Sequence, residues 1–232
     1  LIEQQQATWR VLRRELAEAG LAVLEHADLT ADDRVWLEER FLDHVFPVLT
    51  PLAVDPAHPF PFLPNRGFGI VLQLRRGSDS TFLNAILPLP RQIERFIRLP
   101  GEAIRFISLE NMIELFLGRL FPGYELTGLG HFGVLRDSDL DVDEEAEDLV
   151  LLFETALKRR RRGSVIRLKV DSQMPDRLVR FLTKELQIDG ESVVVVEEIV
   201  GLADTEQLIV SERGDLTFPP KRVRFPERIR DF

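Results

Sequence analysis

The sequence has no cysteine in its 232 residues. This absence excludes a disulfide framework, a metal site built on thiolates and a thiol nucleophile. It fits a protein of the reducing cytoplasm, which is where we expect this chain to be found. At this length, one large domain or one domain with part of another can bury a core without such cross-links.

Long apolar runs and a surplus of positive charge are missing as well. No run approaches the roughly 18–20 apolar residues that a membrane-spanning helix needs. Thirty lysines and arginines face 39 aspartates and glutamates, which gives a net charge of −9. Because nucleic-acid binding requires a clustered positive surface, we expect no nucleic-acid partner. A negative net charge does not exclude basic patches at particular places on the surface.

Helical and extended patterns interleave along the chain without a repeating βαβ rhythm. This arrangement predicts an α+β fold with a mixed or antiparallel sheet and flanking helices, preceded by one helix. Thr30 is expected to cap a helix that runs to Pro47, and Ser108 a helix over 109–121. Strands are expected at 21–24, 67–75, 81–89, 105–108, 131–136, 164–170 and 192–197, and further helices at 1–19, 143–161, 175–186 and 202–210.

The segment 47–66 contains six prolines among many apolar residues. Proline lacks a backbone donor and restricts the residue before it, so neither a helix nor a central strand tolerates this density. We predict an ordered, extended segment packed on the body of the protein.

Residues 128–133 read GLGHFG and match the G-x-G-x-x-G pattern of dinucleotide sites. Such a site needs the glycines after a strand and at the start of a helix. Here the predicted order is reversed, with a helix before and a strand after. A glycine-rich connection is therefore favoured over a cofactor loop.

The stretch from Asp137 to Asp148 is strongly acidic, and Lys158, Arg159, Arg160, Arg161 and Arg162 follow it. A calcium loop counted from Asp137 would need Gly and Glu where Val142 and Asp148 stand. An acidic helix start and a basic helix end, which complement the helix dipole, are favoured over metal binding. The five cations also form a candidate polyanion site.

The four histidines, at positions 26, 44, 58 and 131, are scattered and show no metal-binding or triad spacing. No P-loop or protein-kinase signature occurs. From its residues alone, we expect this chain to be non-catalytic, with no catalytic, cofactor-binding or metal-binding residue of its own.

Several long segments resemble the polyphosphate kinase family, with closest similarity expected to alphaproteobacterial forms. They are FPVLTPLAVDPAHPFPF (46–62), RFISLENMIELFLGRLFPGYE (105–125), RDSDLDVDEEAEDL (136–149), LKRRRRGSVIRLKVD (157–171), MPDRLVRFLTKEL (174–186) and FPERIRDF (225–232). They occur in the family's order and cover essentially the whole chain.

The resemblance implies that residues 1–20 are the last helix of a helical N-terminal domain and that 21–232 are the head domain. The family transfers the terminal phosphate of ATP to polyphosphate through a phosphohistidine, with Mg²⁺. Its catalytic histidines and its phosphate- and Mg²⁺-binding arginines belong to C-terminal domains, whose motifs are absent here. Since the chain starts at Leu1 rather than Met, we expect an internal piece of a longer protein.

Two roles follow as hypotheses. In the first, the chain supports the catalytic domains and carries the contacts that form a homo-oligomer. The resemblance further implies that this oligomer is peripherally membrane-associated in some bacteria. In the second, Lys158–Arg162, together with the basic tail Lys221–Arg230, guides polyphosphate toward the active site.

Overall fold

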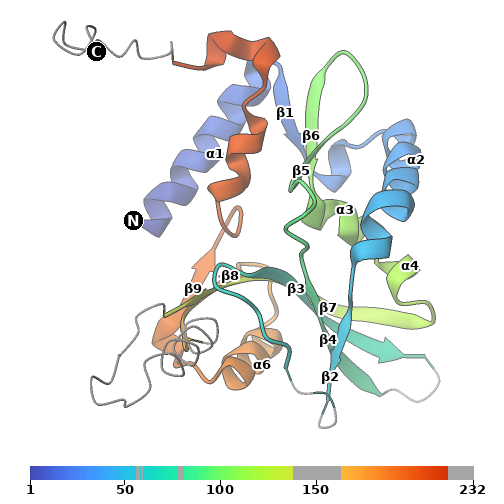
Figure 1. The fold of residues 1–232 in the computed structure, drawn as a ribbon, viewed down its shortest axis with the longest axis vertical. Helices are drawn as coiled ribbons and strands as arrows, with labels where there is room; N and C mark the ends of the chain where they lie inside the picture. The colour runs from blue at the N-terminus through green and yellow to red at the C-terminus, as the bar shows by residue number, and fades with distance from the viewer. Residues whose placement is uncertain (56–57, 59, 78–80, 138–162, 219–232) are drawn as a thin grey trace, which may run out of the picture.

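The computed structural model describes residues 1–55, 58, 60–77, 81–137 and 163–218. Within them, the chain forms two β-sheets with helices packed on both, which confirms the α+β prediction (Figure 1). Both sheets are mixed, because each contains one parallel pair of strands beside antiparallel ones. In the described part, no helix is long and apolar enough to cross a membrane.

The larger sheet has six strands in the order β2-β4-β3-β7-β8-β9. Their bounds are β2 Leu52–Val54, β3 Phe68–Arg76, β4 Phe82–Pro88, β7 Tyr124–Arg136, β8 Val165–Asp171 and β9 Val193–Val196. β3 and β4 correspond to the strands expected at 67–75 and 81–89, and they pair as an antiparallel hairpin. Among its described residues, the proline-rich segment contributes to this sheet only the edge strand β2, which agrees with the limits that proline sets on strands.

The smaller sheet has three strands in the order β1-β6-β5, formed by Leu21–Leu24, Ile104–Ser108 and Phe96–Arg98. The helix α1 (Ile2–Glu18) packs on it through Trp9. The buried side chain of Gln6 on α1 donates to the carbonyl of Ile199 and accepts from the backbone N–H groups of Glu198 and Ile199. These bonds join the start of the chain to the segment after β9.

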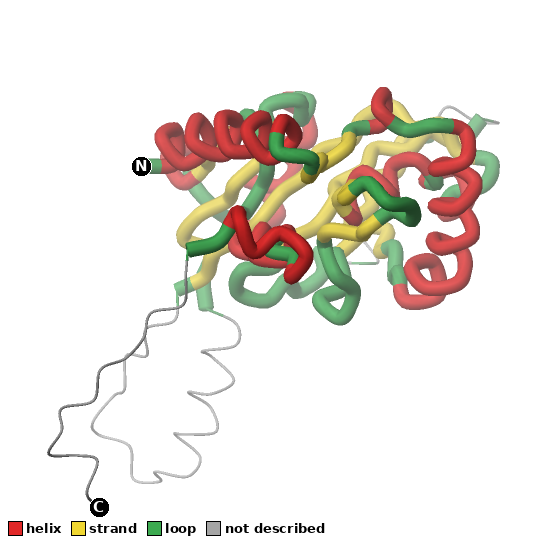
Figure 2. The backbone as a smooth tube through the Cα atoms, turned by 90° about the horizontal axis from the view of Figure 1, so that it is seen from above, coloured by secondary structure: helices red, strands yellow, loops and turns green. Residues whose placement is uncertain are grey.

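Both faces of the six-stranded sheet are covered. Alternate residues on its strands, such as Ile70 and Val71 on β3, point to opposite sides because side chains alternate along a strand. One face packs against α6 (Asp176–Leu186), which buries Leu178 and Leu182. The other packs against α2 (Ala31–Arg40), the following turns over 41–48 and α3 (Leu109–Leu115). Figure 2 shows α1 and α2 at opposite ends of the molecule.

The predicted helix caps are confirmed. The Thr30 hydroxyl accepts from the N–H of Asp33, whose carboxylate accepts from the N–H of Thr30. Ser108 likewise accepts from the N–H of Asn111. The helix expected over 109–121 is broken at Phe116, after which the short helix α4 (Leu117–Leu120) follows. Pro175 lies one position before α6, and residues 203–208 form a 3₁₀ turn.

The prediction of a glycine-rich connection at 128–133 was wrong. All three glycines lie inside the 13-residue strand β7. An added Cβ at Gly130 would lie 2.5 Å from the Met174 side chain, and one at Gly133 would lie 3.2 Å from Val200. These glycines therefore allow neighbouring segments to approach the strand closely. The predicted helix at 143–161 lies outside the described residues.

Candidate functional site

Arg95, just before β5, is the centre of a buried polar cluster. Its guanidinium donates to Glu110 Oε1 on α3 at 2.6 Å and to the carbonyls of Val200 and Gly201 at 2.9 and 2.7 Å. Its Cζ lies 4.3 Å from the centroid of the Phe68 ring on β3. The Arg95 side chain is only 8% exposed, and that of Glu110 is 7% exposed. One side chain thus holds α3, β3 and the segment after β9 together.

His131 forms a second polar contact beside this cluster. It lies on β7, on the sheet face opposite α6, and its Nε2 is 2.8 Å from Glu114 Oε1 on α3. This contact is an ion pair when the imidazole is protonated. Its Nδ1 is 3.8 Å from Asp171 Oδ2 on β8, and that carboxylate also accepts from the His131 backbone N–H.

A small cavity of about 110 Å³ lies next to these residues, between the two sheets and α1. Four carboxylates line it, and all have partners: Glu25 pairs with Arg13, Glu110 with Arg95 and Glu198 with Arg10, while Asp171 accepts backbone N–H groups. In the described ranges, no three His, Cys, Asp or Glu side chains are placed to hold a metal ion. The cavity is therefore lined by satisfied acidic groups, which favours a structural role.

Burial lowers the pKa of His131, but the carboxylate of Glu114, with Glu110 and Asp171, outweighs it and raises the pKa above 6.5. The folded state thus holds the proton more tightly than the unfolded chain. The resulting stabilisation is complete below the unfolded-state pKa and is lost as the pH rises through the raised pKa.

We therefore expect His131→Gln to lose more stability below pH 6.5 than above the raised pKa. Urea unfolding over a pH series would measure this difference. His44→Gln, at an exposed position, is the matched control and should leave the pH profile unchanged. Equal loss for His131→Gln at every pH would contradict the prediction.

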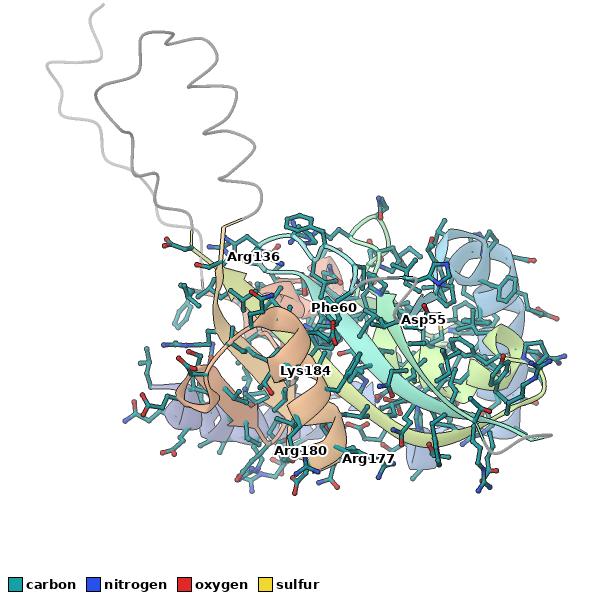
Figure 3. All side chains as sticks on the ribbon, turned by 90° about the horizontal axis from the view of Figure 1, so that it is seen from below. Asp55, Phe60, Arg136, Arg177, Arg180 and Lys184 are labelled. Carbon is teal, nitrogen blue, oxygen red and sulfur yellow. The ribbon has the colours of Figure 1, made fainter. Side chains whose placement is uncertain are left out.

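The outward face of α6 carries a group of basic residues that is separate from the cluster around Arg95 (Figure 3). Arg177, Arg180 and Lys184 are all exposed, and they lie opposite the side that buries Leu178 and Leu182. Arg177 donates to Gln73 Oε1 at 2.5 Å and to the carbonyl of Thr127. None of the three has a carboxylate partner among the described residues. We call these three residues the α6 basic face.

The candidate polyanion residues Lys158, Arg159, Arg160, Arg161 and Arg162 lie outside the described residues, as do the basic tail and the acidic stretch after Asp137. The other three histidines occupy local positions. His26 Nε2 is 2.7 Å from the carbonyl of Asn111, His58 contacts Asp55 in a tight turn, and His44 is exposed.

Sequence reasoning did not find the partners that meet around Arg95. Arg95 and Glu110 are 15 positions apart, and Val200 is 105 positions from Arg95. No local sequence pattern predicts contacts between residues so far apart, because these contacts depend on how the two sheets pack. In the local sequence Glu94 precedes Arg95, and Phe96 and Ile97 follow it, which is not a pattern that singles out a buried cluster.

Comparisons with known proteins agree with this fold. A family model described as the polyphosphate kinase middle domain matches residues 32–208. The polyphosphate kinase of Erythrobacter litoralis is 42% identical over 229 residues, which cover 99% of this chain and 32% of that protein. That of Mycolicibacterium gilvum is 35% identical over 215 residues, covering 90% of this chain and 30% of that protein.

The crystal structure of polyphosphate kinase from Porphyromonas gingivalis has the same fold, with a TM-score of 0.76 and 24% identity. The match covers 96% of this chain and 33% of that one. The chain thus spans about a third of the length of the curated relatives that it matches. The resemblance seen in the sequence is confirmed: the chain belongs to the polyphosphate kinase family, and residues 32–208 match the middle domain of that family.

Proposed function

We propose that this chain is the non-catalytic middle, or head, part of a polyphosphate kinase. The whole enzyme would transfer the terminal phosphate of ATP to polyphosphate through a phosphohistidine on C-terminal domains, with Mg²⁺. Residues 21–232 would be the head and 1–20 the last helix of a preceding helical domain. The head would support the catalytic domains and carry contacts between two copies, with peripheral membrane association in some hosts.

The surroundings of His131 carry the non-catalytic part of the proposal. A phosphohistidine forms when an imidazole nitrogen attacks a phosphoryl group whose charge is held by cations. Here Glu114 lies 2.8 Å from Nε2, and Asp171 lies 3.8 Å from Nδ1. A phosphoryl group on either nitrogen would meet a like charge at close range. This geometry supports a role for His131 in holding β7 to α3.

The test is to incubate the purified chain with ATP labelled at its terminal phosphate, Mg²⁺ and a polyphosphate primer. We expect no polymer and no acid-labile label on the chain, whereas the full-length Erythrobacter litoralis relative should give both. Polymer synthesis, or label that disappears in His131→Gln, would overturn the non-catalytic role.

Light scattering of the same purified chain tests the proposed contact between two copies. We expect the mass of a dimer rather than that of a monomer.

A further inference from the structure

We propose that the α6 basic face binds a linear polyanion, inorganic polyphosphate, through Arg177, Arg180 and Lys184. The choice of polyphosphate as the ligand rests on the proposed function. The choice of surface rests on the geometry and charge of α6.

The spacing of these residues suits a linear ligand. At 3.6 residues per turn, positions 177, 180 and 184 fall within about 60° of one another around the helix axis. Seven residues correspond to about 10 Å along that axis, so the three cations form a row along the helix. Asp176 and Glu185 lie on the flanks of this row and not within it. A chain of phosphates laid along α6 would meet the three cations in succession.

The cations on this face are open to a ligand because the described carboxylates do not pair with them. In a chain with a net charge of −9, many arginines already have carboxylate partners, including Arg10, Arg98, Arg105, Arg119 and Arg213. Within the described part, the cations of α6 have none. Binding a polyanion there would break no ion pair seen in the structure, so attraction is not offset by lost internal pairing.

Arg177 is also held in place before any ligand arrives. Its guanidinium donates to the Gln73 side chain on β3 and to the Thr127 carbonyl on β7. Because this side chain is already ordered, binding costs less conformational entropy than at a free arginine. Its remaining N–H groups can face solvent and the ligand.

The same face favours an inorganic polyanion over single-stranded nucleic acid. Proteins that bind single strands interleave cations with exposed aromatic rings on which bases stack. The nearest aromatic residue on α6, Phe181, instead pairs with Phe60 at a ring-centroid distance of 6.3 Å. The α6 basic face therefore offers charge without a stacking platform.

The test compares two double variants of this chain in a fluorescence anisotropy assay with end-labelled long-chain polyphosphate. R180Q/K184Q removes two cations and keeps Arg177 with its hydrogen bonds. R34Q/R40Q removes two exposed cations from α2 and is the matched control. We expect the α6 variant to bind about tenfold more weakly. A plot of the logarithm of its association constant against the logarithm of the salt concentration should also be less steep, by about 1.4. The control should stay within about twofold of the unaltered chain, and circular dichroism should show that both variants are folded.

Four outcomes would overturn the proposal. The first is that polyphosphate does not bind the unaltered chain at low salt, and the second is that both double variants weaken polyphosphate binding equally. The third is that single-stranded RNA competes as well as unlabelled polyphosphate does. The fourth is that binding weakens only when Arg159–Arg162 are all changed to alanine. The assay contains no ATP. Its failure would therefore leave the middle-domain proposal standing, and catalytic activity of the isolated chain would leave this result unaffected.

Discussion

Arg95→Met is expected to lower the free energy of unfolding by about 3–5 kcal/mol. The methionine would fill part of the space, but Glu110 would remain as a buried carboxylate without its cation. The carbonyls of Val200 and Gly201 would also lose the donor that they share. An unsatisfied buried polar group is costly because the protein interior cannot replace the hydrogen bonds of water.

Urea unfolding followed by circular dichroism would measure this loss. Arg98→Met is the matched control, because Arg98 pairs with Glu212 at the surface, where solvent screens the pair and its removal should change stability little. The double variant Arg95→Met, Glu110→Leu should recover part of the stability, since it removes the stranded charge. A loss below about 1 kcal/mol for Arg95→Met alone would show that the cluster does not hold the two sheets together.

Gly130→Ala is expected to destabilise the protein by about 2–3 kcal/mol, an unusually large effect for adding one methyl group. The new Cβ would lie 2.5 Å from two Met174 side-chain carbons and 2.7 Å from Met174 Cβ. Because that third carbon is fixed to the backbone, a change of rotamer cannot relieve the clash. Either β7 or the turn between β8 and α6 would have to move.

Thermal or urea unfolding of Gly130→Ala beside Gly118→Ala would test this expectation. Gly118 lies in the short helix α4 with open space around its Cβ position, so alanine there should be neutral or slightly stabilising. Met174→Ala should relieve only part of the clash, because it removes Cγ and Cε but keeps the Cβ atom at 2.7 Å. Equal stability of the two single variants would mean that β7 does not need glycine at position 130.

Local patterns were enough to predict most of the elements. The helix α1, the helix cap at Thr30 and the strands β3 and β4 each depend on neighbouring residues, and all are confirmed. The strand β5 was missed because it has only three residues, too few for a periodic pattern. The break at Phe116 was missed because apolar spacing continues across it.

The candidate site was less accessible to sequence reasoning. The glycines of β7 favour a connection when only the sequence is considered, since glycine is unfavourable in strands. Their role becomes visible only when Met174 and Val200 pack against them. The contacts of His131 with Glu114 and Asp171 likewise join three elements that are separate in sequence. The run Lys158–Arg162, which the sequence does single out, stays an untested prediction.

The bonds of Gln6 have a consequence for how the protein forms during synthesis. Its partners lie 192 and 193 positions further along the chain. At about 5–20 residues per second, roughly 10–40 s pass between the synthesis of α1 and that of Ile199. During that interval α1 emerges from the ribosome with its Trp9 face uncovered by the segment it will contact. Until then, the Gln6 side chain lacks the backbone partners that it has in the finished fold.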